Sequence, residues 1–146
     1  MSIRKDFIER AIEQFVAAIA RILQARKEKR YGDARALIQE TSRSVLGMEY
    51  GTLTLADAES TSRLLGTHAR VRMLARLVRE DGELMREQGD PLTADSRFLL
   101  ALELYLEAMS LGLNPDTEDA TAIAELRGVT DPAALSERHQ RMLAQA

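Results

Sequence analysis

The sequence contains no cysteine and no tryptophan, and only three tyrosines and three phenylalanines among 146 residues. Without cysteine there can be no disulfide framework, no thiolate metal site and no cysteine nucleophile. No apolar run approaches the roughly 20 residues that a membrane-spanning helix needs. The opening residues, MSIRKDFIER, are too charged for a secretory signal. We therefore expect a soluble, cytoplasmic protein that does not enter a membrane.

Sequence motifs of enzymes are also missing. The eight glycines are scattered, so no phosphate-binding loop is present, and no serine lies in a nucleophile elbow. The only histidines, His68 and His139, are far apart, and we interpret both as solvated or capping residues. The pair Glu103 and Glu107, one helical turn apart, is interpreted as part of a solvated helix face. We thus predict no catalytic residue, no metal ligand and no cofactor, and expect that the protein is not an enzyme.

The composition favours helices. Hydrophobic residues make up 45% of the chain and charged residues 29%, as in globular proteins. Alanine, leucine, arginine and glutamate are abundant, and they lose little rotamer freedom in a helix. The length suits one domain of ordinary size. We predict a single all-α domain over residues 1–146, without strands.

Apolar periodicity and capping residues divide the chain into helices. In the first, which begins at Ser2 as N-cap and reaches Arg30, apolar residues recur at the 3.5-residue spacing of a helix packed lengthwise on another (Ile8, Ile12, Phe15, Ile19 and Ile22). The remaining expected segments are a helix over 33–46, a loop over 47–53, a short helix opened by a capping box from Thr54 to Asp57, a helix over 68–88 capped by Thr67, a long apolar helix from Phe98 to Leu113, a short helix over 116–126 that ends before Gly128, and a final amphipathic segment capped by Asp131 and Pro132.

Small and turn-forming residues between Val78 and Leu113 follow a packing pattern. Gly82 and Ala94 are small enough for two helices to approach closely, and Gly89 can adopt the left-handed conformation that ends the first of them. Asp90 and Pro91 can then open the second. Counted from Gly82, the pattern has offsets of 0, 7, 8, 12, 16 and 19, which correspond to Gly82, Gly89, Asp90, Ala94, Phe98 and Ala101. The pattern predicts a tight antiparallel helical hairpin.

This spacing of small, glycine, aromatic and alanine residues resembles the tetratricopeptide repeat. The match covers residues 75–101 well. It implies antiparallel helical hairpins of that type, a degenerate first repeat over about 15–46, a second over about 75–113, and additional short helices. The stretches IRKDFIERAIEQ, GELMREQGD and ALELYLEA are also similar to those of a family of short bacterial helical proteins of unknown function.

The repeat resemblance implies a groove that binds a protein or peptide, lined here by Arg72, Arg76, Arg79 and Glu83. Glu83 stands where the carboxylate-binding members of the class carry asparagine, and it would repel a peptide carboxylate. An alternative is a small-ligand or nucleic-acid site on the stripe of Arg72, Arg76 and Arg79. Residues 80–125 disfavour nucleic acid because they carry twelve acidic and only two basic residues.

The apolar stretch from Phe98 to Leu113 carries only Glu103 and Glu107 as charges. A helix that is apolar nearly all round lies either in the centre of a domain or between two subunits, and the sequence leaves both open. If it is shared, Leu100, Leu104 and Leu111 form a dimer interface; the 3.5-spaced face of the first helix is the other candidate. The leading interpretation is a non-enzymatic protein–protein interaction or scaffold module that forms a homodimer.

Overall fold

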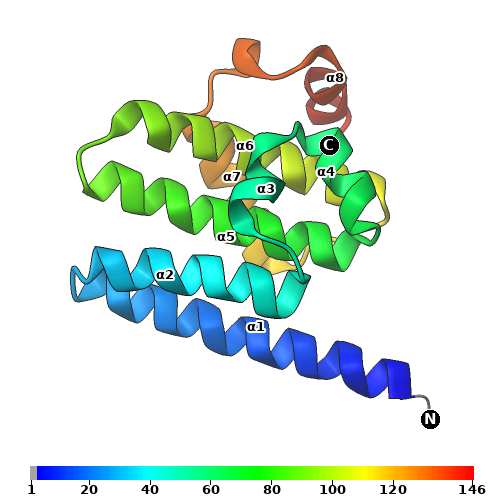
Figure 1. The fold of residues 1–146 in the computed structure, drawn as a ribbon. Coiled ribbons are helices and arrows are strands. Elements are labelled where there is room, and N and C mark those ends of the chain that lie inside the picture. The colour runs from blue at the N-terminus through cyan, green and yellow to red at the C-terminus, as the bar shows by residue number, and fades with distance from the viewer. Residues whose placement is uncertain (1–2) are drawn as a thin grey trace. The chain divides into compact units, whose positions relative to one another are not determined.

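The computed structural model describes residues 3–146, and this part of the chain is predominantly helical and contains no strand (Figure 1). The all-α prediction is therefore confirmed, whereas the expected N-cap, Ser2, lies outside the described residues. The chain groups into two compact units, Met1–Leu53 and Thr54–Ala146. The single-domain prediction stays a prediction. No helix within residues 3–146 has both the length and the apolar character needed to cross a bilayer.

In the first unit, α1 (Ile3–Lys27) and α2 (Tyr31–Thr41) form an antiparallel hairpin (Figure 1). The seam residues in the second half of α1 are buried, with Phe15 6%, Ile19 7% and Ile22 0% exposed. On α2, Ala34 and Ile38 are buried as well. The 3.5-residue spacing thus correctly predicted a lengthwise helix pair over this half of α1.

The end of α2 departs from the regular helix. A π-helical turn, η1 (Ser42–Leu46), follows, and the Ser42 hydroxyl donates a 2.7 Å hydrogen bond to the carbonyl of Met48. Gly47 then adopts a left-handed conformation, with φ of 73°, which ends this arm of the hairpin. The loop predicted for 47–53 is wrong from Tyr50 onward, because α3 (Tyr50–Leu55) begins there.

Helix α4 (Ala58–Leu65) begins later than predicted. Its N-cap is Asp57, whose carboxylate accepts a 2.8 Å hydrogen bond from the backbone N–H of Ser60. Thr54 is not a cap, because it lies inside α3. The capping box predicted from Thr54 to Asp57 was wrong because Asp57 is itself the N-cap, and aspartate is a stronger N-cap than threonine.

The second unit is built on a hairpin of α5 (His68–Glu87) and α6 (Pro91–Ser110). Thr67 caps α5 as predicted, and its hydroxyl accepts from the N–H of Arg70. Gly82 lies against Phe98: a Cβ built on it would come within 2.6 Å of the aromatic ring. At the turn, Gly89 has φ of 82° and Asp90 caps α6, so the packing pattern is confirmed.

Helix α6 is the centre of the second unit. It contacts α4, α5, α7 and α8, and its five consecutive residues Leu104–Ala108 are all at most 2% exposed. A helix that is covered on every side has no polar face, which accounts for the nearly uninterrupted apolar sequence. The sequence left open whether this helix lies in the centre of a domain or between two subunits. For Leu104–Ala108 the structure shows a position in the centre.

Two C-terminal helices complete the second unit. Helix α7 (Thr117–Val129) has a capping box, in which Asp116 accepts from the N–H of Asp119 and Asp119 accepts from the N–H of Asp116. It continues through Gly128, which was expected to break it. After the 3-10 turn η2 (Pro132–Ala134), α8 (Glu137–Gln145) is capped by Ser136 rather than by Asp131 and Pro132.

Candidate functional site

The arginine stripe of α5 faces the acidic side of α7. The Nε atom of Arg72 lies 2.5 Å from Asp119, and its Nη2 lies 3.3 Å from Asp116. Further along, Arg76 pairs with Glu118 and Arg79 with Glu125. Binding of a polyanion to this stripe would require these ion pairs to break.

A buried carboxylate, Glu80, lies between the arginines on α5. It is 1% exposed and lies 3.5 Å from Nε of Arg76 and 3.8 Å from Nη1 of Arg79. Beneath them, burial raises the pKa of the Tyr105 hydroxyl to about 12, so it stays protonated at neutral pH. The stripe therefore resembles an internal ion network, in which each arginine is engaged by carboxylates, more than an open cation surface.

The fourth residue of the predicted groove, Glu83, also lies on α5, and its carboxylate pairs with Arg86. The guanidinium of Arg86 in turn lies over the ring of Phe98, 5.6 Å from its centroid. The structure thus places Arg72, Arg76, Arg79 and Glu83 along α5 but engages each of them with a neighbour inside the second unit.

The three leucines predicted for a dimer interface do not form one exposed face. Leu104 has no exposed surface, whereas Leu111 is 44% exposed just beyond the end of α6. Leu100 is partly exposed. Leu104 therefore belongs to the core because α6 is covered all round, and it has no surface to offer a second protomer.

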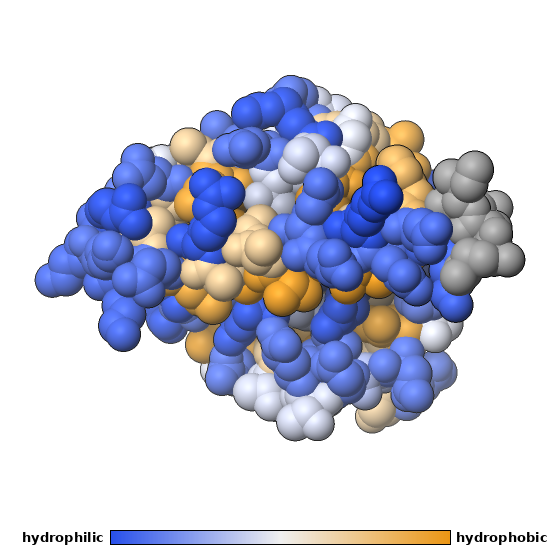
Figure 2. Space-filling model, turned by 90° about the horizontal axis from the view of Figure 1, so that it is seen from below, coloured by the Kyte–Doolittle hydropathy of each residue, from blue (hydrophilic) through white to orange (hydrophobic). Residues whose placement is uncertain are grey.

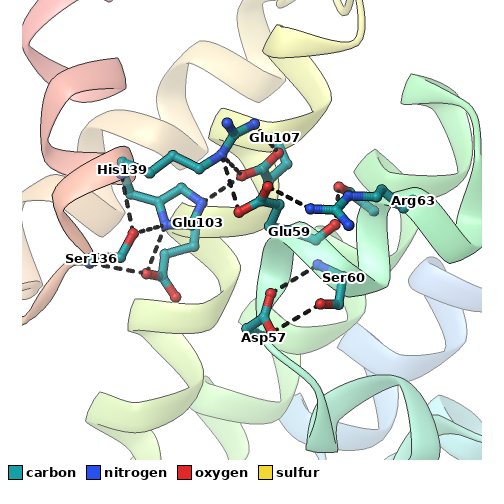
Figure 3. A network of polar contacts seen from close by, with 10 residues as sticks. Asp57, Glu59, Ser60, Arg63, Glu103, Glu107, Ser136 and His139 are labelled. Carbon is teal, nitrogen blue, oxygen red and sulfur yellow. Dashed lines mark hydrogen bonds and ion pairs between the residues drawn. The ribbon is translucent and has the colours of Figure 1, made fainter.

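A polar cluster that the sequence did not predict joins α6 to α8 (Figure 3). The ring of His139, 4% exposed, lies between two carboxylates: Nδ1 is 3.0 Å from Glu103 and Nε2 is 2.7 Å from Glu107. The expectations of a solvated or capping His139 and of a solvated carboxylate face were wrong for His139 and Glu107, which are both buried.

An arginine completes this cluster. Arg138 binds both oxygens of Glu107 through Nε at 2.9 Å and Nη2 at 3.0 Å, and it lies 3.7 Å from Glu59 on α4. Glu59 also pairs with Arg63. Burial raises the pKa of Glu107, but the hydrogen bonds from Arg138 and His139 outweigh it and hold that pKa below its ordinary value.

The ring nitrogens of His139 contact carboxylate oxygens directly, and no group of three or more side chains that could hold a metal ion is found among residues 3–146. Ser136 lies 2.5 Å from Nδ1 of His139, but its Oγ accepts from the backbone N–H of the same residue as a helix cap. A histidine held between two carboxylates favours its protonated form.

The largest group of exposed apolar side chains within one helix lies on the first half of α1. Phe7 is 72% exposed, Ile8 49%, Ile12 43% and Val16 62%. Apolar surface emerges between polar side chains on the face of the molecule seen in Figure 2. Exposed apolar surface gathered in this way marks interaction sites in many proteins.

No protein-family model, curated protein or solved structure gives a match to the chain. The resemblance to the tetratricopeptide repeat and to short bacterial helical proteins therefore stays a prediction.

Proposed function

We propose that this chain is a non-enzymatic protein-association module that pairs with a second copy of itself through the first half of α1. The observation that carries the proposal is the exposure of Phe7, Ile8, Ile12 and Val16 on one helix. Removing such side chains from water is the main favourable contribution to protein association.

The exposed residues belong to the same apolar seam of α1 that packs on α2 further along the helix. Ile8 and Ile12 belong to the same 3.5-spaced series as Phe15, Ile19 and Ile22, which are buried in the hairpin. Helix α1 has 25 residues, whereas α2 and η1 have 11 and 5, and Gly47 then turns the chain away. About nine residues of α1, roughly 13 Å of helix, extend past this arm with the seam exposed.

The charges of this segment suit pairing with itself. Between Arg4 and Glu13 there are three basic and three acidic residues (Arg4, Lys5, Asp6, Glu9, Arg10 and Glu13). Two copies can approach without net repulsion, and an antiparallel arrangement about a two-fold axis brings identical surfaces together. A strongly basic or acidic partner would gain nothing from a segment with no net charge.

The dimer should be weak. Each of the eight side chains in the pair is about half exposed, so its burial contributes about 1–1.5 kcal/mol. A total of about 8–12 kcal/mol is opposed by at least about 4 kcal/mol of lost rotational and translational freedom. The difference corresponds to a Kd between about 1 µM and 1 mM.

We also propose that the α1–α2 and α5–α6 hairpins are tetratricopeptide-like repeats. The close contact between Gly82 and Phe98 and the left-handed Gly89 support this assignment for the second hairpin. Two repeats are fewer than the three or so that such arrays need, and a homodimer would supply the missing neighbour.

Sedimentation equilibrium over a concentration series up to about 1 mM tests the pairing. Ile12→Glu is expected to abolish the dimer with unchanged helicity by circular dichroism, because it places a charge in the seam. Leu92→Glu, at a leucine that is 83% exposed on α6, is the matched control and should dimerise like the wild type. A wild-type monomer throughout the series would refute the proposal. A dimer that survives Ile12→Glu but is lost in Leu111→Glu would move the interface to the end of α6.

A further inference from the structure

Helix α8 is held in place mainly by polar contacts. Of its nine residues only His139 is buried, while Met142 and Leu143 are half-buried. A groove of about 310 Å³ lined by Leu106, Met109 and Met142 remains between its C-terminal end and α6. Apolar packing beneath this helix is therefore incomplete, and the cluster around His139 has to supply much of its attachment.

The geometry around His139 matches an imidazolium. A protonated ring donates from both nitrogens, so it satisfies Glu103 at Nδ1 and Glu107 at Nε2. A neutral ring has one N–H. A neutral ring can donate to Glu107 through Nε2–H and accept at Nδ1 from the Ser136 hydroxyl. Its Nδ1 lone pair then faces the carboxylate of Glu103 without a proton between them.

The charges of the cluster balance only when the ring is protonated. The groups around His139 are Glu103 and Glu107 on α6, Arg138 on α8, and beyond Arg138 the pair Glu59 and Arg63 on α4 (Figure 3). Three carboxylates then face two guanidinium groups and one imidazolium. Loss of the histidine proton leaves one negative charge in excess at a site where Glu107 is 2% exposed.

We propose that α8 is a proton-controlled latch, which is docked on α6 while His139 is protonated and is released when the ring loses its proton. Burial lowers the pKa of His139, but the hydrogen bonds that its ring donates to Glu103 and Glu107 outweigh this effect, and the pKa in the docked state lies above the ordinary 6.5. A raised histidine pKa means that docking gains stability below the ordinary pKa and loses it as pH rises through the docked-state pKa. An isolated helix of nine residues is marginal in water, so release also unfolds α8.

The latch makes a quantitative prediction that links two measurements. Docking raises the pKa of His139 relative to the released state. For every unit of this rise, the docking constant should fall about tenfold across the titration. The ring titration is followed by NMR in a His68→Gln background, which leaves a single imidazole. Docking is followed by hydrogen exchange of the α8 amides, corrected for the intrinsic pH dependence of exchange and referred to the amides of α5.

We expect that protection of the α8 amides falls as pH rises from the ordinary histidine pKa of 6.5 through the higher NMR pKa of His139, while protection of α5 stays constant. Glu103→Gln should lower that pKa and reduce the pH-dependent change, with the fold retained because Glu103 is 15% exposed. Asp95→Asn, an exposed carboxylate on the same helix, is the matched control and should behave like the wild type. His139→Gln should remove the pH dependence altogether.

Constant α8 protection across this range in the wild type would overturn the latch. Full pH dependence in Glu103→Gln would also overturn the latch, because Glu103 is the second carboxylate, and only a protonated ring can donate to both carboxylates. If His139→Gln does not fold, Glu103→Gln decides alone, because it leaves the histidine in place.

Discussion

Replacement of Gly82 by alanine tests the tight hairpin at its closest point. The added Cβ would lie 2.6 and 2.7 Å from two ring carbons of Phe98, a ring that is only 2% exposed. Contacts this short force a shift of the ring or of the helices. Overpacking of this kind typically costs 1–3 kcal/mol.

A second effect of the same substitution has the opposite sign. Alanine is favoured over glycine in a helix interior by about 0.8–1 kcal/mol. The net expectation for Gly82→Ala is therefore a loss of about 1 kcal/mol in the free energy of unfolding, measured by urea denaturation. This corresponds to a fall in Tm of several degrees for a protein of this size.

The chain provides a matched control for this substitution. Gly128 is also inside a helix of the second unit, in the last turn of α7, and a Cβ there would meet nothing within 4 Å. Gly128→Ala should raise the free energy of unfolding by roughly 0.3–0.8 kcal/mol through propensity alone. The same chemical change is thus expected to act with opposite signs at two positions.

A double-mutant cycle identifies the cause. If the loss in Gly82→Ala comes from the ring, Phe98→Leu should cost less in the alanine background than in the wild type, because the smaller side chain relieves the overlap. Equal stabilisation by Gly82→Ala and Gly128→Ala would refute the close packing of α5 on α6.

Two further predictions concern contacts in the second unit. Asp119 is 3% exposed, and a double-mutant cycle with Arg72→Gln and Asp119→Asn should give a coupling energy of about 1–2 kcal/mol. The carboxylate of Glu118 is 61% exposed, so the corresponding cycle with Arg76→Gln and Glu118→Gln should give only about 0.2–1 kcal/mol. Equal coupling energies in the two cycles would contradict an effect of burial on these ion pairs. Asp57→Ala removes the N-cap of α4 and should lower the free energy of unfolding by about 1 kcal/mol. Because its hydrogen bonds to Ser60 lower the pKa of Asp57, this difference should be present at neutral pH and disappear as pH falls through that lowered pKa, which unfolding at a series of pH values will show.

The α5–α6 hairpin was predictable because its determinants are local. Gly89 and Asp90 act on their own backbone, and the contact of Gly82 with Phe98 joins residues only sixteen positions apart. The structural effect of small residues and N-caps can therefore be predicted from the sequence without knowledge of distant contacts. The first helix pair was predictable for a similar reason, since a regular apolar spacing specifies a lengthwise partner.

The cluster around His139 was not predictable in the same way. Its partners Glu107 and His139 lie 32 residues apart, and no periodicity relates them. One signal was present: Glu103 and Glu107 interrupt a stretch that is otherwise apolar all round. A carboxylate on a helix that is covered on every side needs a cationic partner, and His139 and Arg138 are the cations that meet it.

The sequence could not assign Leu104 to the core, because apolar sequence alone does not distinguish a central helix from one shared between two subunits. Leu104 and Ile12 are equally apolar, yet one is fully buried and the other 43% exposed. The difference arises from the number of neighbouring helices. Four helices pack on α6, whereas the second arm of the first hairpin ends at Leu46 before it covers the start of α1.

The second unit combines an apolar hairpin with helices attached by charge. Close packing of Gly82 against Phe98 holds α5 to α6, and an ion pair between Arg97 and the buried carboxylate of Asp81 joins the same two helices. The ion pairs of Arg72, Arg76 and Arg79 hold α7, and the His139 cluster holds α8. Salt screens the exposed pairs of α7 far more than the buried contacts of α8, whereas deprotonation of His139 acts on α8 alone. The two C-terminal helices should therefore loosen independently, α7 with ionic strength and α8 with rising pH, while the α5–α6 hairpin stays folded.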